Sequence, residues 1–160
     1  MRHHKNDSGN FSRTREHHID SHPEIKRTWR TLIVEDNGIF RQTLKNLLLG
    51  RFPFMEVGEA KDGEEADQKI NGVHPDLIFM DIRLPGISGL ELTKRIKKSK
   101  SHAVIIILTS HNLPEYREAA TRCGADFFLT KGSATAEEIL NLVDSILSEH
   151  FYPQMVKKTV

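Results

Sequence analysis

The stretch Asp76-Leu77-Ile78-Phe79-Met80-Asp81-Ile82-Arg83-Leu84-Pro85-Gly86 decides the fold of this 160-residue chain. Four consecutive apolar residues are bounded by carboxylates and followed by a Pro-Gly turn signal, which is typical of a buried parallel strand rather than of a helix. Open α/β sheets carry their chemistry at the carboxyl ends of their strands, so we expect Asp81 at the mouth of a sheet. An Asp in this place also commonly caps the following turn, and this stretch alone leaves both interpretations open.

Composition excludes several classes of protein. Hydrophobic residues make up 38% and charged residues 28% of the chain, which favours a soluble globular protein. We see no apolar run of the ~18 residues that a membrane span needs and no signal peptide, so we expect a cytoplasmic protein without membrane contact. The single cysteine, Cys123, excludes an internal disulfide and fits a reducing compartment as a packed thiol at a helix end. A net charge of +1 argues against direct binding of nucleic acid.

The first 29 residues differ from the rest of the chain. They contain very few apolar side chains, which predicts a flexible, basic, His-rich tail over residues 1–29. Five of the nine histidines lie there: His3, His4, His17, His18 and His22. His18 and His22 have the spacing of helical metal ligands, but Pro23 follows directly, and we favour incidental metal affinity over a built site. Trp29, at the junction, is expected to pack against the following domain or against a partner.

From residue 30 onward, strand patterns alternate with helix patterns. This alternation predicts a doubly wound α/β domain over residues 30–149, with a five-stranded parallel sheet covered on both faces, and a short C-terminal tail over residues 150–160. Ser88 with Glu91, and Thr135 with Glu138, have the spacing of capping boxes. The expected strands are 31–34, 55–60, 76–81, 103–108 and 125–129, and the expected helices are about 39–48, 64–72, 88–98, 114–123 and 135–149.

Polar side chains follow four of the predicted strands. Because the ends of parallel strands share one edge of the sheet, we expect these side chains to meet. Carboxylates gathered there would repel one another unless a cation lay between them, and oxygen ligands of this kind suit Mg²⁺. A hydroxyl and an ammonium beside them are what a transferred phosphoryl group requires, so one carboxylate is predicted to accept that group. The residues concerned are Glu35, Asp36, Asp81, Thr109 and Lys131.

Four segments, taken together, resemble the receiver domain of bacterial response regulators in two-component signal transduction. They are Val34-Glu35-Asp36-Asn37, the run from Phe79 to Gly86, Leu108-Thr109-Ser110 and the run from Phe128 to Gly132. The resemblance covers about residues 30–149. It implies the flavodoxin-like (βα)5 fold with strand order 2-1-3-4-5.

The same resemblance implies roles for the strand-end residues. Asp81 would be the phosphoacceptor, attacking phosphohistidine on a sensor histidine kinase or on a histidine phosphotransfer protein. Glu35, Asp36 and Asp81 would hold Mg²⁺, with the backbone carbonyl of Arg83 as a further ligand. Such a domain catalyses only its own aspartyl phosphorylation and dephosphorylation and is not a conventional enzyme.

Further positions would convert phosphorylation into a signal. Thr109 would hydrogen-bond the phosphoryl group and Lys131 would pair with it. Phe128 stands at the aromatic switch position and lacks the phenol hydroxyl of the commoner Tyr, so we expect its switch to run on packing alone. Arg83 and His111, which flank the acceptor and the threonine in this family, are bulky. We hypothesise that they shield the phosphoryl group and prolong its lifetime.

Phosphorylation is expected to change the surface of residues 113–149. An unknown downstream protein would bind this surface, or two copies of the chain would form a homodimer through it. Residues 151–160 are too few for an output domain, so we expect either a stand-alone receiver or a piece of a longer protein.

Two other functions compete with the switch. A phosphatase of the haloacid dehalogenase type would need a second Asp two residues after the nucleophile, where this chain has Arg83. A degenerate receiver would act as a phosphorylation-independent interaction domain. It is the less economical alternative, because every chemically required position is filled.

Overall fold

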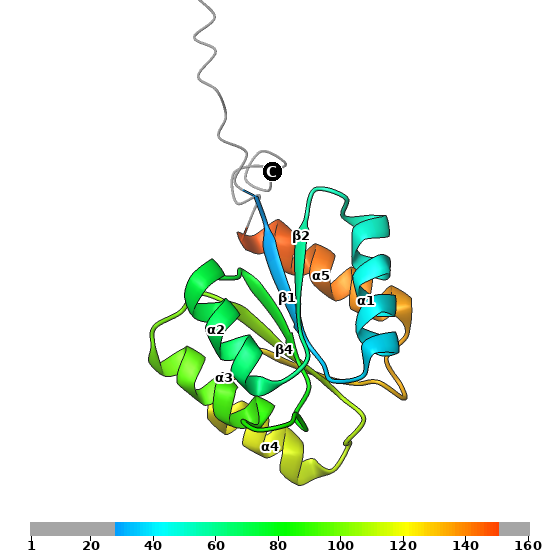
Figure 1. The fold of residues 1–160 in the computed structure, drawn as a ribbon. Helices are drawn as coiled ribbons and strands as arrows, with labels where there is room; N and C mark the ends of the chain where they lie inside the picture. The colour runs from blue at the N-terminus through cyan, green and yellow to red at the C-terminus, as the bar shows by residue number, and fades with distance from the viewer. Residues whose placement is uncertain (1–27, 151–160) are drawn as a thin grey trace, which may run out of the picture.

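A computed structural model of the protein describes residues 28–150 and shows five strands alternating with five helices (Figure 1). The strands are all parallel and lie in the order β2-β1-β3-β4-β5, which confirms the predicted receiver-type fold class. Most of the predicted tail 1–29, and residues 151–160, lie outside the described residues. The elements are β1 Arg30–Val34, α1 Gly38–Arg51, β2 Glu56–Ala60, α2 Gly63–Val73, β3 Leu77–Met80, α3 Gly89–Lys98, β4 Val104–Thr109, α4 Pro114–Cys123, β5 Phe127–Thr130 and α5 Ala136–His150.

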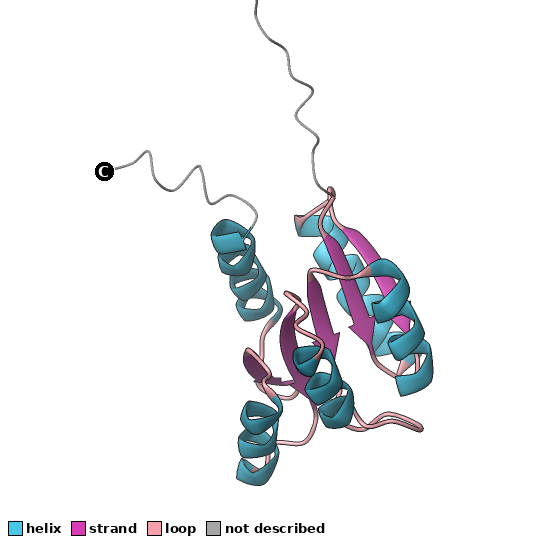
Figure 2. Cartoon of the chain, turned by 90° about the vertical axis from the view of Figure 1, so that its left-hand side faces the viewer, coloured by secondary structure: helices cyan, strands magenta, loops and turns pink. Residues whose placement is uncertain are grey.

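Helices cover both faces of the sheet, as Figure 2 shows from the side. Helices α1 and α5 pack with one side of each strand, and α2, α3 and α4 pack with the other side. Successive residues of a strand point to opposite faces, so Ile33 joins the first core and Leu32 joins the second. Strand β4, between β3 and β5, is buried along its whole length, as its uninterrupted apolar run predicts.

Local sequence signals set the ends of several helices as predicted. The Ser88 hydroxyl accepts a hydrogen bond from the Glu91 N–H at 3.2 Å and caps α3. Thr135 and Glu138 exchange two hydrogen bonds, at 2.8 and 3.1 Å, and form the second capping box. Gly124, with φ of 94°, ends α4 in the left-handed conformation that a residue without Cβ adopts easily.

Strand β5 begins at Phe127, two residues later than predicted. The Ala125 N–H donates to the Ala120 carbonyl at 3.0 Å and so completes the C-terminal turn of α4 instead of joining the sheet. The apolar pattern extends across this junction, and it therefore does not separate a helix cap from the strand that follows.

Trp29 belongs to the core on the α1–α5 side, where it is only 2% exposed. Its carbonyl accepts a hydrogen bond from the Glu56 N–H at 2.9 Å, directly before the paired stretch of β1 and β2. The sequence predicts that Trp29 packs against the domain or against a partner protein. In the structure it packs against the domain.

No helix among residues 28–150 is long and apolar enough to cross a bilayer.

Candidate functional site

The strand ends bring three carboxylates together. Glu35 and Asp36 follow β1, and Asp81 follows β3, where the Asp81 N–H donates to the Val34 carbonyl at 3.0 Å. Each side chain offers one carboxylate oxygen, and these three oxygens lie within 4.8 Å of one another. Glu35 and Asp81 are 3% and 7% exposed, whereas Asp36 faces the solvent. The cluster is therefore a largely buried concentration of negative charge that is open on one side.

Lys131 is the cation within this cluster. Its Nζ lies 2.5 Å from Oε2 of Glu35 and 3.1 Å from Oδ2 of Asp81. It also lies 4.5 Å from the centre of the Phe40 ring, over the ring face. Burial works to lower the pKa of Lys131, but the hydrogen bond with Glu35 and the charge of Asp81 outweigh it, so the pKa is raised. The side chain is consequently a firmly charged ammonium.

Burial raises the pKa of Glu35. The hydrogen bond from Lys131 opposes this shift, and so does the Asn37 N–H, which donates to Oε1 of Glu35 at 3.0 Å. The negative charge of Asp81 raises the pKa further. One ammonium thus serves two buried carboxylates, and a further cation at this place would be electrostatically favourable.

The residues present fit a magnesium ion. Oδ1 of Asp81 is buried and accepts no hydrogen bond from any residue between 28 and 150. An unsatisfied buried carboxylate oxygen is costly, and a hard cation or a phosphoryl group would satisfy it. The donor set consists of carboxylate oxygens, which Mg²⁺ prefers over the softer nitrogen and sulfur ligands. Glu35, Asp36 and Asp81 are the side chains that would hold the ion.

Thr109 ends β4 with its side chain fully buried. Its hydroxyl accepts a hydrogen bond from the His111 N–H at 3.3 Å, and the Lys131 N–H donates to its carbonyl at 2.9 Å. The hydroxyl and the ammonium therefore come from neighbouring strands at the same edge of the sheet as the carboxylates.

Phe128, on β5, has a partner that the sequence analysis missed. The guanidinium carbon of Arg117 on α4 lies 4.6 Å from the centre of the Phe128 ring, a cation–π geometry. The ring is half-buried, so it has a charged partner in addition to its packing contacts. The expectation that this position relies on packing alone is therefore incomplete. Arg117 stands on an exposed helix face, and no sequence signal links it to a strand residue.

Arg83 and His111 also share a partner that the sequence analysis did not single out. Nη2 of Arg83 donates to the Tyr116 hydroxyl at 3.1 Å. The rings of His111 and Tyr116 lie 5.6 Å apart between centres, at an interplanar angle of 46°. Tyr116 lies in the first turn of α4, and its aromatic character there was the one available hint.

A comparison with family models identifies this arrangement. Residues 31–144 match the model of the response regulator receiver domain. The chain belongs to the response regulator receiver family. This receiver is 30% identical over 110 residues to response regulator GacA of Pseudomonas viridiflava, a match covering 69% of the chain and 51% of the relative. It is 32% identical over 121 residues to response regulator UvrY of Escherichia coli K12, covering 76% and 55%. The receiver thus spans about half the length of these relatives.

Solved receiver domains have the same fold. A CheY-like response regulator receiver domain protein from Methanospirillum hungatei superposes with a TM-score of 0.69 at 27% identity, covering 76% of this chain and 95% of that one. A LuxR-family DNA-binding response regulator from Staphylococcus aureus gives a TM-score of 0.69 at 26% identity, covering 74% and 98%. The matched domain, residues 31–144, is a receiver and not a conventional enzyme domain.

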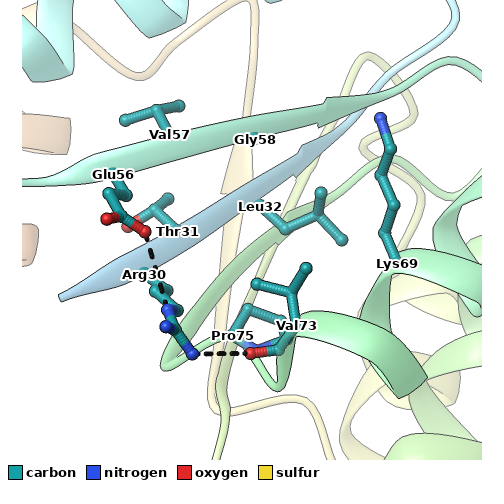
Figure 3. Close-up of a pocket in the computed structure, with 9 residues that line it drawn as sticks. All are labelled: Arg30, Thr31, Leu32, Glu56, Val57, Gly58, Lys69, Val73 and Pro75. Atoms are coloured by element: carbon teal, nitrogen blue, oxygen red, sulfur yellow. Dashed lines mark hydrogen bonds and ion pairs between the residues drawn. The ribbon is translucent and has the colours of Figure 1, made fainter. Parts of the chain in front are cut away.

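A separate groove of about 410 Å³ lies at the opposite ends of β1 and β2, beside α2 (Figure 3). Nε of Arg30 lies 3.6 Å from Oε2 of Glu56, and Nη1 of Arg30 donates to the Val73 carbonyl at 3.2 Å. None of the residues predicted for the site lines this groove. Glu35, Asp36 and Asp81 lie at the other end of the sheet.

Proposed function

We propose that this receiver is a phosphorylation-dependent signalling switch with Asp81 as the acceptor. A sensor histidine kinase or a histidine phosphotransfer protein would supply the phosphoryl group. The observation that carries the proposal is the buried Oδ1 of Asp81, which has no hydrogen-bond partner among residues 28–150 and lies beside an ammonium and two further carboxylates. A nucleophilic oxygen without a competing hydrogen bond is free to attack.

The transfer step exchanges one bond for another. A carboxylate oxygen of Asp81 attacks phosphorus, and a P–O bond forms while the P–N bond to the donor imidazole breaks. The electron pair of that bond stays on the imidazole nitrogen, which then takes a proton from solvent. Lys131, 3.1 Å from Oδ2, offsets the negative charge of the reacting groups, and the Thr109 hydroxyl donates to a phosphoryl oxygen of the product.

The phosphoryl transfer would depend on a metal ion bound by the acidic cluster. Glu35, Asp36 and Asp81 would hold Mg²⁺. The backbone carbonyl of Arg83 would be a further ligand, as the family resemblance implies. Bound Mg²⁺ supplies charge neutralisation for the transferred phosphoryl group. Arg41 supports this end of β1, because its Nη1 donates to the Glu35 carbonyl at 2.7 Å.

Output follows from the added charge. Phosphorylation adds roughly −1.5 to −2 charges, to which Thr109 and Lys131 respond. Lys131 belongs to the segment 113–149, and its N–H donates to the Thr109 carbonyl at 2.9 Å. In the same segment Phe128 lies under Arg117. The phosphoryl group would shift a two-state equilibrium of the surface of residues 113–149 and so control a downstream protein or a homodimer, in the cytoplasm.

The test is the intact mass of the protein after incubation with Mg²⁺ and acetyl phosphate. We expect one phosphate on the wild type and none on Asp81→Asn. The matched control is Asp144→Asn, which changes an exposed aspartate on α5 and should accept phosphate like the wild type.

Two outcomes would contradict the proposal. Addition to Asp81→Asn would place the acceptor elsewhere. No addition to the folded wild type would favour the degenerate receiver, an interaction domain that works without phosphate.

A further inference from the structure

Helix α3 ends in a cluster of basic side chains that the proposed switch does not use. Residues 94–102 contain Lys94, Arg95, Lys97, Lys98 and Lys100 and no acidic residue. Lys94, Lys98 and Lys100 are exposed. No hydrogen bond or ion pair joins their ammonium groups to any residue between 28 and 150. We refer to Lys94, Lys98 and Lys100 together as the lysine patch.

The other two cations of this segment have acidic partners. Nε of Arg95 lies 3.1 Å from Oε1 of Glu91, one helical turn earlier. Nζ of Lys97 lies 2.7 Å from Oδ2 of Asp126, and it also donates to the Ala103 carbonyl at 2.9 Å. Arg95 and Lys97 are thus neutralised within the fold, whereas the lysine patch keeps its positive charge.

Two features indicate that the fold gains little from the lysine patch. Lys94 and Lys98 are four residues apart on one face of the helix, where like charges repel. The helix dipole favours cations in the last turn, which accounts for Lys98 but not for Lys94, one turn earlier. Lys100 has φ of 57°, in the left-handed region that favours glycine. A binding role would explain lysine at positions where the fold does not require it.

The lysine patch and the acidic site lie at opposite ends of α3. The helix begins with Gly89 against the Asp81 carbonyl and ends at Lys98. Its ten residues span about 15 Å. The Debye length at physiological ionic strength is about 8 Å, so the carboxylates of the site reduce the positive potential of the patch only weakly. The net charge of +1 is a sum over the whole chain and does not describe this end of α3.

We propose that the lysine patch binds the phosphate backbone of duplex DNA without reading its sequence. Duplex DNA carries one negative charge per ~1.7 Å of its axis, and cations that neutralise phosphates gain from the release of counterions. Lysine is a point charge suited to this contact, whereas base recognition favours the bidentate fork of arginine. The one arginine of the segment is already paired with Glu91.

Other anionic partners need features that the patch lacks. Protein interfaces and single-stranded nucleic acids are held by aromatic or large apolar side chains. The described chain exposes such side chains only away from α3, at Ile39, Phe54, Val73, Leu113 and Phe127.

An anionic bilayer also fits this face less well than a duplex. Helix α4 packs beside α3 and exposes Glu115 and Glu118 (Figure 1). A flat surface that touched both helices would meet these carboxylates together with the lysines. A narrow duplex can contact the end of α3 alone.

The experiment measures the fluorescence anisotropy of a short labelled DNA duplex, titrated with the full chain in KCl from about 20 to 200 mM. The logarithm of the affinity should fall with the logarithm of the salt concentration with a slope of about −3, one step for each lysine. Lys94→Gln with Lys98→Gln should reduce this slope by about 2 and weaken binding by about tenfold per lysine at the lowest salt. A duplex of unrelated sequence should bind equally.

Three control variants separate binding from structure, bulk charge and phosphorylation. Arg51→Gln with Lys61→Gln removes two exposed charges outside α3 and should bind like the wild type. Lys100→Gly removes a charge of the patch and suits the left-handed backbone, so binding should weaken while the thermal midpoint stays the same or rises. Asp81→Asn should bind DNA like the wild type, because the inference does not depend on the proposed function.

Three results would overturn the inference. The first is a wild type that does not bind the duplex at the lowest salt. The second is unchanged binding in Lys94→Gln with Lys98→Gln, which would place the contact elsewhere in the chain. The third is tighter binding to phosphatidylglycerol vesicles than to the duplex at equal salt, which would assign a lipid partner. None of these results affects phosphate addition to Asp81, so failure of the proposed function is measured separately.

Discussion

Lys131 is the residue on which the electrostatics of the site depends. It is 96 residues away from Glu35 in sequence, and its Nζ lies within hydrogen-bond distance of both Glu35 and Asp81. One ammonium therefore limits the repulsion between two buried carboxylates before any other cation arrives. The two carboxylates differ at this scale, because both oxygens of Glu35 accept hydrogen bonds while Oδ1 of Asp81 accepts none among the described residues. Asp81, the proposed acceptor, is therefore the carboxylate with an available oxygen.

Glu59 supports the site from the neighbouring strand. Its carboxylate accepts from Nε of Arg41 at 3.1 Å and from Nζ of Lys45 at 3.0 Å. Arg41 in turn holds the carbonyl of Glu35. The hydrogen bond with Lys45, helped by Arg41, lowers the pKa of Glu59 below its ordinary value of 4.5.

Glu59→Gln should therefore reduce the free energy of unfolding by about 0.5–1 kcal/mol at neutral pH. A carboxyl group with a lowered folded-state pKa stabilises the fold above its unfolded-state value of 4.5. That contribution disappears as the pH falls through the lower folded-state pKa. The difference between variant and wild type should accordingly shrink on acidification, which urea unfolding over a pH series would measure.

The control for this change is Glu56→Gln. Glu56 pairs with Arg30 at 3.6 Å, and its side chain is 64% exposed, so a smaller loss is expected. An equal loss in both variants, or a Glu59→Gln difference that does not vary with pH, would contradict the role assigned to Glu59.

At the scale of elements, helix α3 sits directly against the backbone of Asp81, the proposed acceptor. Gly89 begins the helix, and its N–H donates to the Ile82 carbonyl at 2.9 Å. A Cβ at this position would lie 1.8 Å from the Asp81 carbonyl oxygen. Only glycine permits this approach, because it has no Cβ. The start of α3 can therefore pack directly against the backbone that follows β3.

Gly89→Ala should therefore destabilise the protein by about 1–3 kcal/mol, because either α3 or the backbone of Asp81 must move. Phosphorylation by acetyl phosphate should slow as well. Urea unfolding and the rate of phosphate addition measure the two effects.

Gly72→Ala provides the comparison, because nothing lies within 4 Å of the Cβ that it would add on helix α2. Alanine is the better helix former, so stability should rise by up to about 1 kcal/mol with phosphorylation unchanged. Equal behaviour of the two variants would show that the close approach at Gly89 has no consequence.

At the scale of the whole molecule, the site lies at the carboxyl-terminal edge of the sheet, and a different layer of helices covers each face of that sheet. In the α2–α3–α4 layer, Tyr116 and Arg117 on α4 contact Arg83 and Phe128, which follow or belong to strands whose ends lie at the site. Helix α1 and strand β2 are linked to the site through Arg41 and Glu59 on the other flank. The structural change on phosphorylation should thus be larger on the α4 side of the molecule than on the side of α1 and β2.

Hydrogen exchange would measure this asymmetry. On phosphorylation with acetyl phosphate and Mg²⁺, we expect amide exchange to change mainly within residues 109–149, which cover the loop after β4, helix α4, strand β5 and most of helix α5. Exchange over β2 and α2 should stay close to that of the unphosphorylated protein. Asp81→Asn under the same conditions is the control and should show no change. A change spread evenly over both flanks would contradict a response led by α4.

Much of the fold could be predicted because its signals are local. Apolar runs, capping boxes and the glycine after α4 act over a few residues, and each specifies its own strand or helix end. The meeting of Glu35, Asp36 and Asp81 also followed, since parallel strands deliver their ends to one edge of the sheet. The start of β5 was misplaced because a helix cap and a strand start share the same apolar pattern there.

The sequence by itself determined the alternation of strands and helices and the set of polar residues at the strand ends. Only the tertiary structure decided which oxygen has no partner among residues 28–150, which face of the sheet each helix covers, and which distant side chains make contact. Tyr116 meets Arg83 across 33 residues, and Lys131 meets Glu35 across 96. Contacts of this kind depend on the packing of whole elements, and no periodicity along the chain encodes them.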